Sequence, residues 1–325
     1  MGVKIYMFNN MAYVYEVYKE KSFSRAAENL YITQPSLSAT VKKVEAQLDA
    51  PLFDRSTNPV QLTDCGREYI NCVEKIMDIE NGFANYLADL SGAATGNLTV
   101  GANSFFCSYI LPSVITGFIQ RYPRVNIKLV EADTSSLEKQ LFNGGLDIVV
   151  DSYDFGETAY QKHHFYSETM LLAVPQKYVE AGKFSSYRLA LADIIAGRHL
   201  DNATMSVPLG MLAHVPFILL KPKNSTRVVA DRVFAQTGII PNVILELDQL
   251  ATAYRLSCHG MGATIASDTL VMKMSHYRDI CYFKMEAHHA RRDNAFFYKK
   301  NKYVTRAMQE FVRIATELQP SASNG

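Results

Sequence analysis

The chain has 325 residues, of which 48% are hydrophobic and 20% are charged, and its formal net charge is +1. This composition indicates a globular protein with a real core, and the length suits two or three domains. No apolar run reaches the roughly 18 residues that cross a bilayer, and residues 1–21 lack the pattern of a signal peptide. We therefore expect a cytoplasmic protein with no membrane partner. The small net charge neither favours nor excludes nucleic acid.

Residues 5–48 carry the pattern of three successive helices. Apolar residues at three- and four-residue steps in 5–20 predict a first helix that packs on the next two. Two further apolar stripes follow, made by Phe23, Ala26, Ala27 and Leu30 and then by Leu37, Val41, Val44 and Leu48. Between them Thr33 can cap the next helix, and Pro35 fits its first turn. Two helices joined by a tight turn predict a helix-turn-helix, although a helical hairpin that binds nothing shows the same pattern.

A short hairpin is expected after the third helix. Asp49–Pro51 ends that helix, because the residue before a proline disfavours helical backbone. Residues 53–62 then predict a hairpin wing with its turn at Ser56–Pro59. Arg55 in this wing would reach a phosphate or the minor groove of DNA, and the alternative is a solvated surface arginine.

A long helix is predicted from Thr63 and Asp64, which supply a capping residue and an acid in the first turn. Its apolar residues alternate four- and three-residue steps, interrupted at Glu80: Tyr69, Val73, Ile76, Phe83, Leu87 and Leu90. This repeat is typical of a coiled coil, whose seam needs a partner to bury it. We expect a linker helix over 64–92 through which two subunits dimerise, the alternative being a packed surface helix. Residues 91–96 mark a domain boundary.

The motifs of the first 66 residues resemble those of the LysR-type transcriptional regulators in order and spacing. The resemblance rests on Ser22–Ala27, Thr33–Ser38, Leu52–Arg55 and Leu62–Thr63 with Gly66. It implies a winged helix-turn-helix DNA-binding domain over residues 1–63. The match separates this interpretation from a bare helical hairpin, because several motifs recur together.

Candidate DNA contacts cluster on the second and third helices and on the wing: Ser24, Arg25, Thr33, Gln34, Pro35, Ser36, Ser38, Lys42, Lys43 and Arg55. The four cations would hold phosphates, while Gln34, Ser36 and Ser38 would contact base edges. Many relatives carry Arg or Gln where this chain has Ala39, so DNA shape is expected to contribute to specificity. Residues 1–63 hold seven basic against six acidic residues. This weak electrostatic footprint predicts a strong dependence on oligomerisation.

Beyond Gly96, strand-like runs alternate with amphipathic helical stretches, the rhythm of βαβ units around a mostly parallel sheet. The pattern resembles the periplasmic-binding-protein-like effector domain of the same family, opening at Gly96–Gly101. The resemblance implies two Rossmann-like subdomains. We expect subdomain I at 97–170 and 270–318, subdomain II at 171–269, and a disordered tail at 319–325.

A small-molecule effector is expected where strand ends and helix starts of the two halves converge. The candidate residues are Asn103, Ser104, Phe105, Thr134, Ser135, Ser152, Phe217, Ile218, Leu219 and Gln249. Hydroxyls and free backbone donors at helix starts suit an acid group. The aromatic and aliphatic side chains favour an organic effector, so we expect an organic anion. Each hydroxyl has the alternative of serving merely as a helix cap.

The resemblance implies double-stranded DNA, the effector and a second copy of the chain as partners, with homotetramers and contact to RNA polymerase as further expectations. The alternative is a solute-binding or enzymatic α/β protein whose N-terminal helices are only structural. Neither a dinucleotide fingerprint around Gly260 and Gly262 nor a nucleophile motif supports an enzyme. We expect no cofactor and no catalytic residue.

Metal and redox chemistry find little support. The pairs His163–His164 and His288–His289 are adjacent in sequence, so we expect exposed side chains rather than metal ligands. The five cysteines, an odd count without ligand spacing, predict free and buried thiols: Cys65, Cys72, Cys107, Cys258 and Cys281. Some relatives sense oxidants through a cysteine pair, but no such pair is marked here.

Overall fold

A computed structural model describes residues 7–90, 96–180, 182–222, 224–275, 277, 279–286 and 290–318. The chain forms two compact units, one of Met1–Tyr86 with Phe142–Gly145 and the other of Leu87–Leu141 with Leu146–Gly325. The expected tail at 319–325 and the boundary residues 91–95 lie outside the described residues. Among the described residues, none of the helices has the length and hydropathy that crossing a membrane requires.

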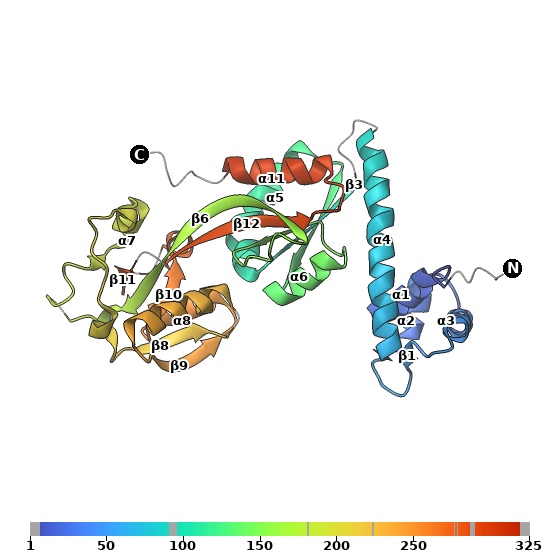
Figure 1. Cartoon of the computed structure of the whole chain (residues 1–325), viewed down its shortest axis with the longest axis horizontal. Coiled ribbons are helices and arrows are strands. Elements are labelled where there is room, and N and C mark those ends of the chain that lie inside the picture. The colour runs from blue at the N-terminus through green and yellow to red at the C-terminus, as the bar shows by residue number, and fades with distance from the viewer. Residues whose placement is uncertain are drawn as a thin grey trace. The chain divides into compact units, whose positions relative to one another are not determined.

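The first unit is a winged helix-turn-helix (Figure 1). Its elements are α1 (Met11–Glu20), α2 (Phe23–Asn29), α3 (Gln34–Leu48), β1 (Phe53–Asp54), β2 (Gln61–Leu62) and α4 (Asp64–Leu90). The hydroxyl of Ser22 caps α2 by accepting from Arg25 N, and that of Thr33 caps α3 by accepting from Ser36 N. β1 and β2 pair antiparallel as the wing. The predicted helices, turn and wing are all present.

One core joins these elements. It is formed by Val14, Val17, Ala26, Ala27, Leu37, Val41, Val44, Leu52, Phe53, Tyr69, Ile70 and Val73. Tyr69 and Val73, from the predicted coiled-coil seam, therefore pack on the helix-turn-helix. Further along α4 the apolar residues are exposed, namely Ile79, Phe83, Tyr86, Leu87 and Leu90. The seam thus has two parts. Tyr69 and Val73 belong to the core, whereas Phe83, Leu87 and Leu90 are exposed, where a partner could contact them.

The second unit contains two lobes, linked by the long strands β6 (Tyr160–Pro175) and β12 (Arg291–Lys299) (Figure 1). The first lobe holds β3 (Gly96–Ala102), α5 (Leu111–Arg121), β4 (Val125–Glu131), α6 (Thr134–Phe142), β5 (Ile148–Asp151) and α11 (Arg306–Leu318), with a π-helical turn at Phe106–Ile110. The second holds β7 (Arg188–Leu189), α7 (Leu191–Ile195), β8 (Pro216–Leu220), α8 (Ser225–Thr237), β9 (Asn242–Leu247), α9 (Leu250–Cys258), β10 (Thr264–Ser267), α10 (Asp268–Lys273) and β11 (Ile280–Lys284).

Strand pairing explains how the lobes are joined. β3 pairs in parallel with β4 and β5, and β8 pairs in parallel with β9, as βαβ units require. β12 pairs antiparallel with both β5 and β6, while the far end of β6 pairs with β10 and β11. β6 therefore belongs to both lobes. The chain returns to the first lobe along β12, later than the expected start of that return at residue 270.

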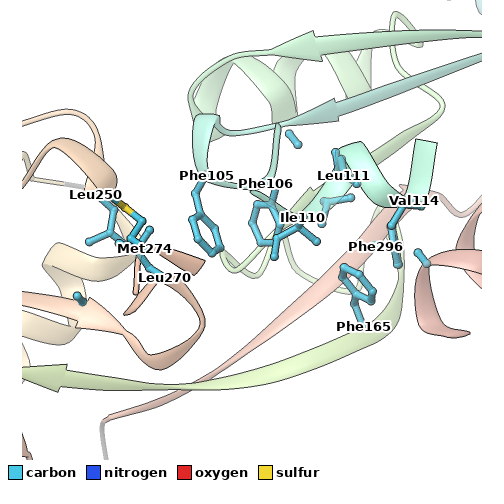
Figure 2. Close-up of a cluster of buried hydrophobic side chains, with 14 of the residues drawn as sticks. Phe105, Phe106, Ile110, Leu111, Val114, Phe165, Leu250, Leu270, Met274 and Phe296 are labelled. Atoms are coloured by element: carbon cyan, nitrogen blue, oxygen red, sulfur yellow. The ribbon is translucent and has the colours of Figure 1, made fainter. Parts of the chain in front are cut away.

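A continuous hydrophobic core crosses from one lobe to the other. Figure 2 shows Phe105 and Phe106 of the first lobe near Leu250, Leu270 and Met274 of the second. A separate core fills the second lobe, and a smaller one lies under α6 in the first. Because apolar side chains of both lobes exclude water together, this contact contributes to holding the lobes against each other.

Candidate DNA-binding surface and effector site

The α3 helix exposes a polar face opposite its buried one. Leu37, Val41 and Val44 are at most 1% exposed and hold α3 against the bundle. The other candidates on α3 and its cap are exposed, namely Thr33, Gln34, Pro35, Ser36, Lys42 and Lys43, while Ser38 is partly buried. Spacing of this kind leaves one face of the helix free to enter a major groove.

The turn before α3 adds one residue that the sequence analysis did not select. Tyr31 has a backbone φ of 54° and its side chain is 96% exposed. The left-handed backbone closes the turn and directs the amide of Ile32 back to the carbonyl of Ala27, at 3.1 Å. An aromatic ring with nothing to pack on, two residues before the α3 cap, is a candidate contact. In the sequence, Tyr31 could have been noticed as an apolar residue that belongs to neither helical stripe.

Arg55 joins the wing to α3. Its guanidinium pairs with Glu45 at 2.9 Å, donates to the Ser38 hydroxyl at 3.2 Å, and lies 4.9 Å from the centre of the Phe23 ring. Glu45 also accepts from the amides of Leu52 and Phe53, at 2.9 and 3.3 Å. These contacts hold the start of the wing on α3. Arg55 is thus occupied within the domain rather than free like a surface arginine.

The remaining candidate cations differ in their availability. Arg25 donates to the carbonyl of Glu20 at 3.0 Å, yet its side chain is 65% exposed. Within the described part of the chain, Lys42 and Lys43 are exposed and make no ion pair. Ser24 is exposed beside Arg25 on α2. The two lysines are therefore the free positive charges of the α3 face.

Between the lobes lies a polar network that the sequence analysis found only in part. Thr134 donates to Asp151 at 2.9 Å, and Ser152 lies 2.8 Å from the hydroxyl of Ser225 at the start of α8. Arg292 on β12 donates to the hydroxyls of Ser225 and Thr226 at 3.1 and 2.8 Å. Thr134 and Ser152 were candidates, and the structure brings both into this network. The Ser152–Ser225 contact joins the first lobe to the second.

Two carboxylates of the protein are buried beside this network. Asp151 is fully buried and accepts from the amides of Ser152 and Tyr153 at 2.7 and 3.0 Å, and burial raises its pKa. At α10, Asp268 accepts from the amide of Thr169 at 3.1 Å and lies 3.0 Å from the ring of His199. Asp268 also accepts from the amide of Thr269 in the first turn of α10, at 2.6 Å, so the protein itself fills this helix start.

The other effector candidates are distributed differently. Asn103 caps the turn that follows β3 by accepting from the amides of Phe105 and Phe106, at 3.0 and 3.3 Å. Ser104 is partly buried beside it, while Ser135 and Gln249 are exposed. Phe105 is 6% exposed and is directed toward the second lobe (Figure 2).

The three β8 candidates lie in the interior. Phe217 and Leu219 belong to the core of the second lobe, and Ile218 belongs to the core shared by both lobes. All three are at most 2% exposed. Because the strand is covered on both faces, these side chains are packing residues in this structure.

Residues absent from the candidate set form the charged centre of the network. Arg292 pairs with Glu168, its cross-strand neighbour on β6, and Asn294 and Tyr166 are the next such pair. Glu168 and Asn294 are 1% and 0% exposed. A late strand with charged residues gives no sequence signal of burial. Only the pairing of β6 with β12 places these four side chains together.

The described residues contain no cluster of three His, Cys, Asp or Glu side chains placed to hold a metal ion. His163 and His164 are exposed, whereas His288 and His289 lie outside the described residues. All five cysteines are free, as expected, but Cys65 and Cys72 are exposed on α4, which corrects the expectation of burial. Burial raises the pKa of Cys107 and of Cys258 to about 11, so both stay protonated thiols at neutral pH.

Comparison with known proteins agrees with this architecture. The family model for the bacterial regulatory helix-turn-helix protein, lysR family, matches residues 8–67, and that for the LysR substrate binding domain matches residues 91–320. An uncharacterized HTH-type transcriptional regulator YcgK of Bacillus subtilis is 31% identical over 307 residues, covering 94% of this chain and 93% of its own. A probable RuBisCO transcriptional regulator of Trieres chinensis is 28% identical over 260 residues, or 78% of each chain.

Solved structures share the fold. Full-length CbnR complexed with its target DNA aligns over 95% of this chain and 99% of its own, with a TM-score of 0.63 and 18% identity. A full-length variant of OxyR from Pseudomonas aeruginosa aligns over 97% and 95%, with a TM-score of 0.67 and 20% identity. The predicted fold class is confirmed, and a family of transcriptional regulators leaves no support for the enzymatic or solute-binding alternative. The chain belongs to the LysR family of transcriptional regulators, with a helix-turn-helix DNA-binding domain and a C-terminal substrate-binding domain.

Proposed function

We propose that this regulator binds a specific operator as a dimer, with the exposed face of α3 in the major groove, and responds to a small organic effector between its two lobes. The observation that carries the DNA-binding part is the polar face of α3, which is exposed while the opposite face is buried. Because the protein binds DNA, we expect it to act in the cytoplasm.

The candidate contacts divide by what they can do. Gln34 and Ser36 at the start of α3 carry hydrogen-bonding groups suited to base edges. Lys42 and Lys43 supply phosphate contacts, and Ser24, Arg25, Thr33 and Pro35 line the approach to the backbone. Arg55 acts as a positioning residue that fixes the wing on α3, since Glu45 and Ser38 already occupy its guanidinium.

Dimerisation through α4 is supported by its exposed apolar residues. Phe83 is 62% exposed, Leu87 50% and Leu90 65%, on a helix of 27 residues. Isolated exposed apolar residues are common, but a row of them at coiled-coil spacing needs a partner helix to exclude water. A second copy of α4 would supply it and set two α3 helices on one DNA. Tetramers and a contact with RNA polymerase remain expectations from the family.

The effector part rests on the polar network between the lobes. Its residues come from both lobes: Thr134 starts α6, Ser152 follows β5, Ser225 starts α8 and Arg292 lies on β12. A ligand that changes these contacts would change how the lobes meet, and a ligand shifts an equilibrium only by its differential affinity for the two states.

Sequence-specific binding can be tested without knowing the operator. The full chain would be used to select duplexes from a library of random sequence, and the affinity for the selected site would be compared with that for scrambled DNA. We expect the selected site to bind at least about a thousandfold more tightly at fixed salt. Failure to enrich any sequence over repeated rounds would contradict the proposed function.

A further inference from the structure

The β6–β12 ribbon carries buried polar atoms that the protein itself does not satisfy. Arg292 faces Glu168 across the two strands, and Asn294 faces Tyr166 in the next pair. Directly opposed residues and their neighbours two positions away share one face of a ribbon. The opposite face, with Arg291 and Asp293, makes exposed hydrogen bonds to Ser167. The inner face is therefore shielded from solvent, unlike the outer face.

Side chains of this inner face keep free hydrogen-bonding capacity. Both amide atoms of Asn294 and Oε2 of Glu168 are buried with no hydrogen-bond partner in the described residues. Asn294 is 0% and Glu168 1% exposed. A buried polar group left unsatisfied loses its hydration without compensation and destabilises the fold. Water, an ion or a ligand can supply the missing bonds at such a group.

The unsatisfied atoms of this inner face favour a ligand that donates hydrogen bonds over one that only accepts them. Oε2 of Glu168 can only accept, whereas the Asn294 amide can both accept and donate. The guanidinium of Arg292 is already engaged by Glu168, Ser225 and Thr226. These contacts use three of its five N–H groups, and none of them reaches Oε2 of Glu168.

The local charge points the same way. Glu168 and Asp268 are buried carboxylates beside this ribbon, and Arg292 pairs with Glu168. Asp268 has the His199 ring at 3.0 Å, while Asp151 has hydroxyl and amide donors only. Burial, with a smaller contribution from Glu168, raises the pKa of Tyr166. A carboxylate ligand would bring a second anion to Oε2 of Glu168, whereas an ammonium group would donate a hydrogen bond to it.

We propose that the effector presents a primary ammonium group to Glu168 and Asn294 on the inner face of the β6–β12 ribbon. This rests on the proposed effector role and replaces the organic acid expected from the sequence. Tyr166, the neighbour of Asn294 across the ribbon, packs against the apolar core that the two lobes share, and this core suits a hydrocarbon body attached to the amine.

The test uses matched probes on the full chain: pentylamine, 1-pentanol and pentanoate, and benzylamine, benzyl alcohol and benzoate. We expect each amine to raise Tm by roughly 2–4 °C at several times its Kd. We expect it to bind at least about tenfold more tightly than the matching acid in calorimetric titrations. Each alcohol should bind with an affinity between those of the matching amine and acid. An acid that binds as tightly as its amine, or the absence of binding in both sets, would overturn the proposal.

Variants place the site. Asn294→Leu keeps the side-chain volume and removes only unsatisfied amide atoms, so the ligand-free protein should keep its Tm while the amine shift disappears. Glu168→Gln should reduce the amine preference, and Asn202→Leu, at an exposed position, should leave it unchanged. An amine preference that survives Asn294→Leu would overturn the assignment to this ribbon. An acid that binds and alters DNA binding would overturn the amine proposal while leaving effector control of transcription intact.

Discussion

Gln34 stands at the start of α3 with an exposed side chain, in the turn that we propose to enter the major groove. A bidentate amide contact to a base contributes about 1–3 kcal/mol of discrimination. We expect Gln34→Ala to weaken binding to the selected site by about that amount per contact and to leave binding to scrambled DNA unchanged. Fluorescence anisotropy with labelled duplexes measures both. Gln47→Ala, at the other end of α3, is the control, and an equal loss there would contradict the assignment.

The three cations near the α3 face should differ in how salt affects their contribution. The logarithm of the binding constant falls as the logarithm of the salt concentration rises, and each phosphate contact adds about 0.9 to the magnitude of that negative slope. We expect Lys42→Ala and Lys43→Ala each to reduce the magnitude of that slope by about one for each subunit bound to the DNA. Arg55→Ala should weaken binding with the slope unchanged, because Arg55 is bound to Glu45 and Ser38. A lower slope for Arg55→Ala would show instead that it leaves Glu45 for phosphate.

Asp151 gives a prediction about pH. Burial raises its pKa, so the folded protein holds this proton more tightly than the unfolded chain does. Stability therefore falls as the pH rises from the ordinary Asp pKa, about 3.9, through the raised value. Asp151→Asn keeps an oxygen for the two amides and can donate to Thr134. We expect a higher Tm than the parent at pH 7, and an advantage that shrinks as the pH falls toward 4.

Asp133 is the matched control for that experiment, with the opposite sign. Hydrogen bonds from Ser136 lower the pKa of Asp133, so its ionised form stabilises the folded protein above the ordinary Asp pKa. Asp133→Asn should lower Tm at pH 7, with the difference disappearing as the pH falls through the lowered value. Shifts of the same sign in both variants would refute the burial argument for Asp151.

At the scale of the elements, α4 combines two kinds of surface. Tyr69 and Val73 are core residues of the DNA-binding unit, and Phe83 lies exposed further along. Replacing Phe83 with Asp adds a charge to the apolar row that a partner helix would have to bury. We expect sedimentation equilibrium to show the full chain shifted toward monomer, with operator affinity reduced. Asn81→Asp, on an exposed part of the same helix away from the row, should keep the parent's oligomeric state.

At the scale of the whole effector unit, the two lobes meet through an apolar contact and a hydroxyl contact. Ser225 joins them by lying 2.8 Å from Ser152 and accepting from Arg292. We expect Ser225→Ala to cost about 1 kcal/mol of unfolding free energy, the usual value of one hydrogen bond. Hydrogen exchange should also quicken in the β6–β12 ribbon. Ser185→Ala, whose hydroxyl bonds within its own turn, serves as control, and unchanged exchange in Ser225→Ala would argue against this contact as a link.

The sequence alone determined the DNA-binding unit. Its helices carry local signals in short windows: a capping hydroxyl at Thr33, apolar stripes of helical period, and a proline after α3. Each of these acts within a few residues, so the order and type of the elements could be predicted. The α/β rhythm beyond Gly96 was local in the same sense, and it predicted the class of the second unit.

Tertiary structure decided the contents of the interlobe site. Arg292 and Glu168 are 124 residues apart, and no local pattern distinguishes them from surface charges. Their burial follows from the antiparallel pairing of β6 with β12. Phe217 looked like a lining residue at a strand end, but the lobe covers β8 on both faces. Periodicity fixes which face of an element is apolar, whereas the partner that covers the other face depends on how distant segments pack.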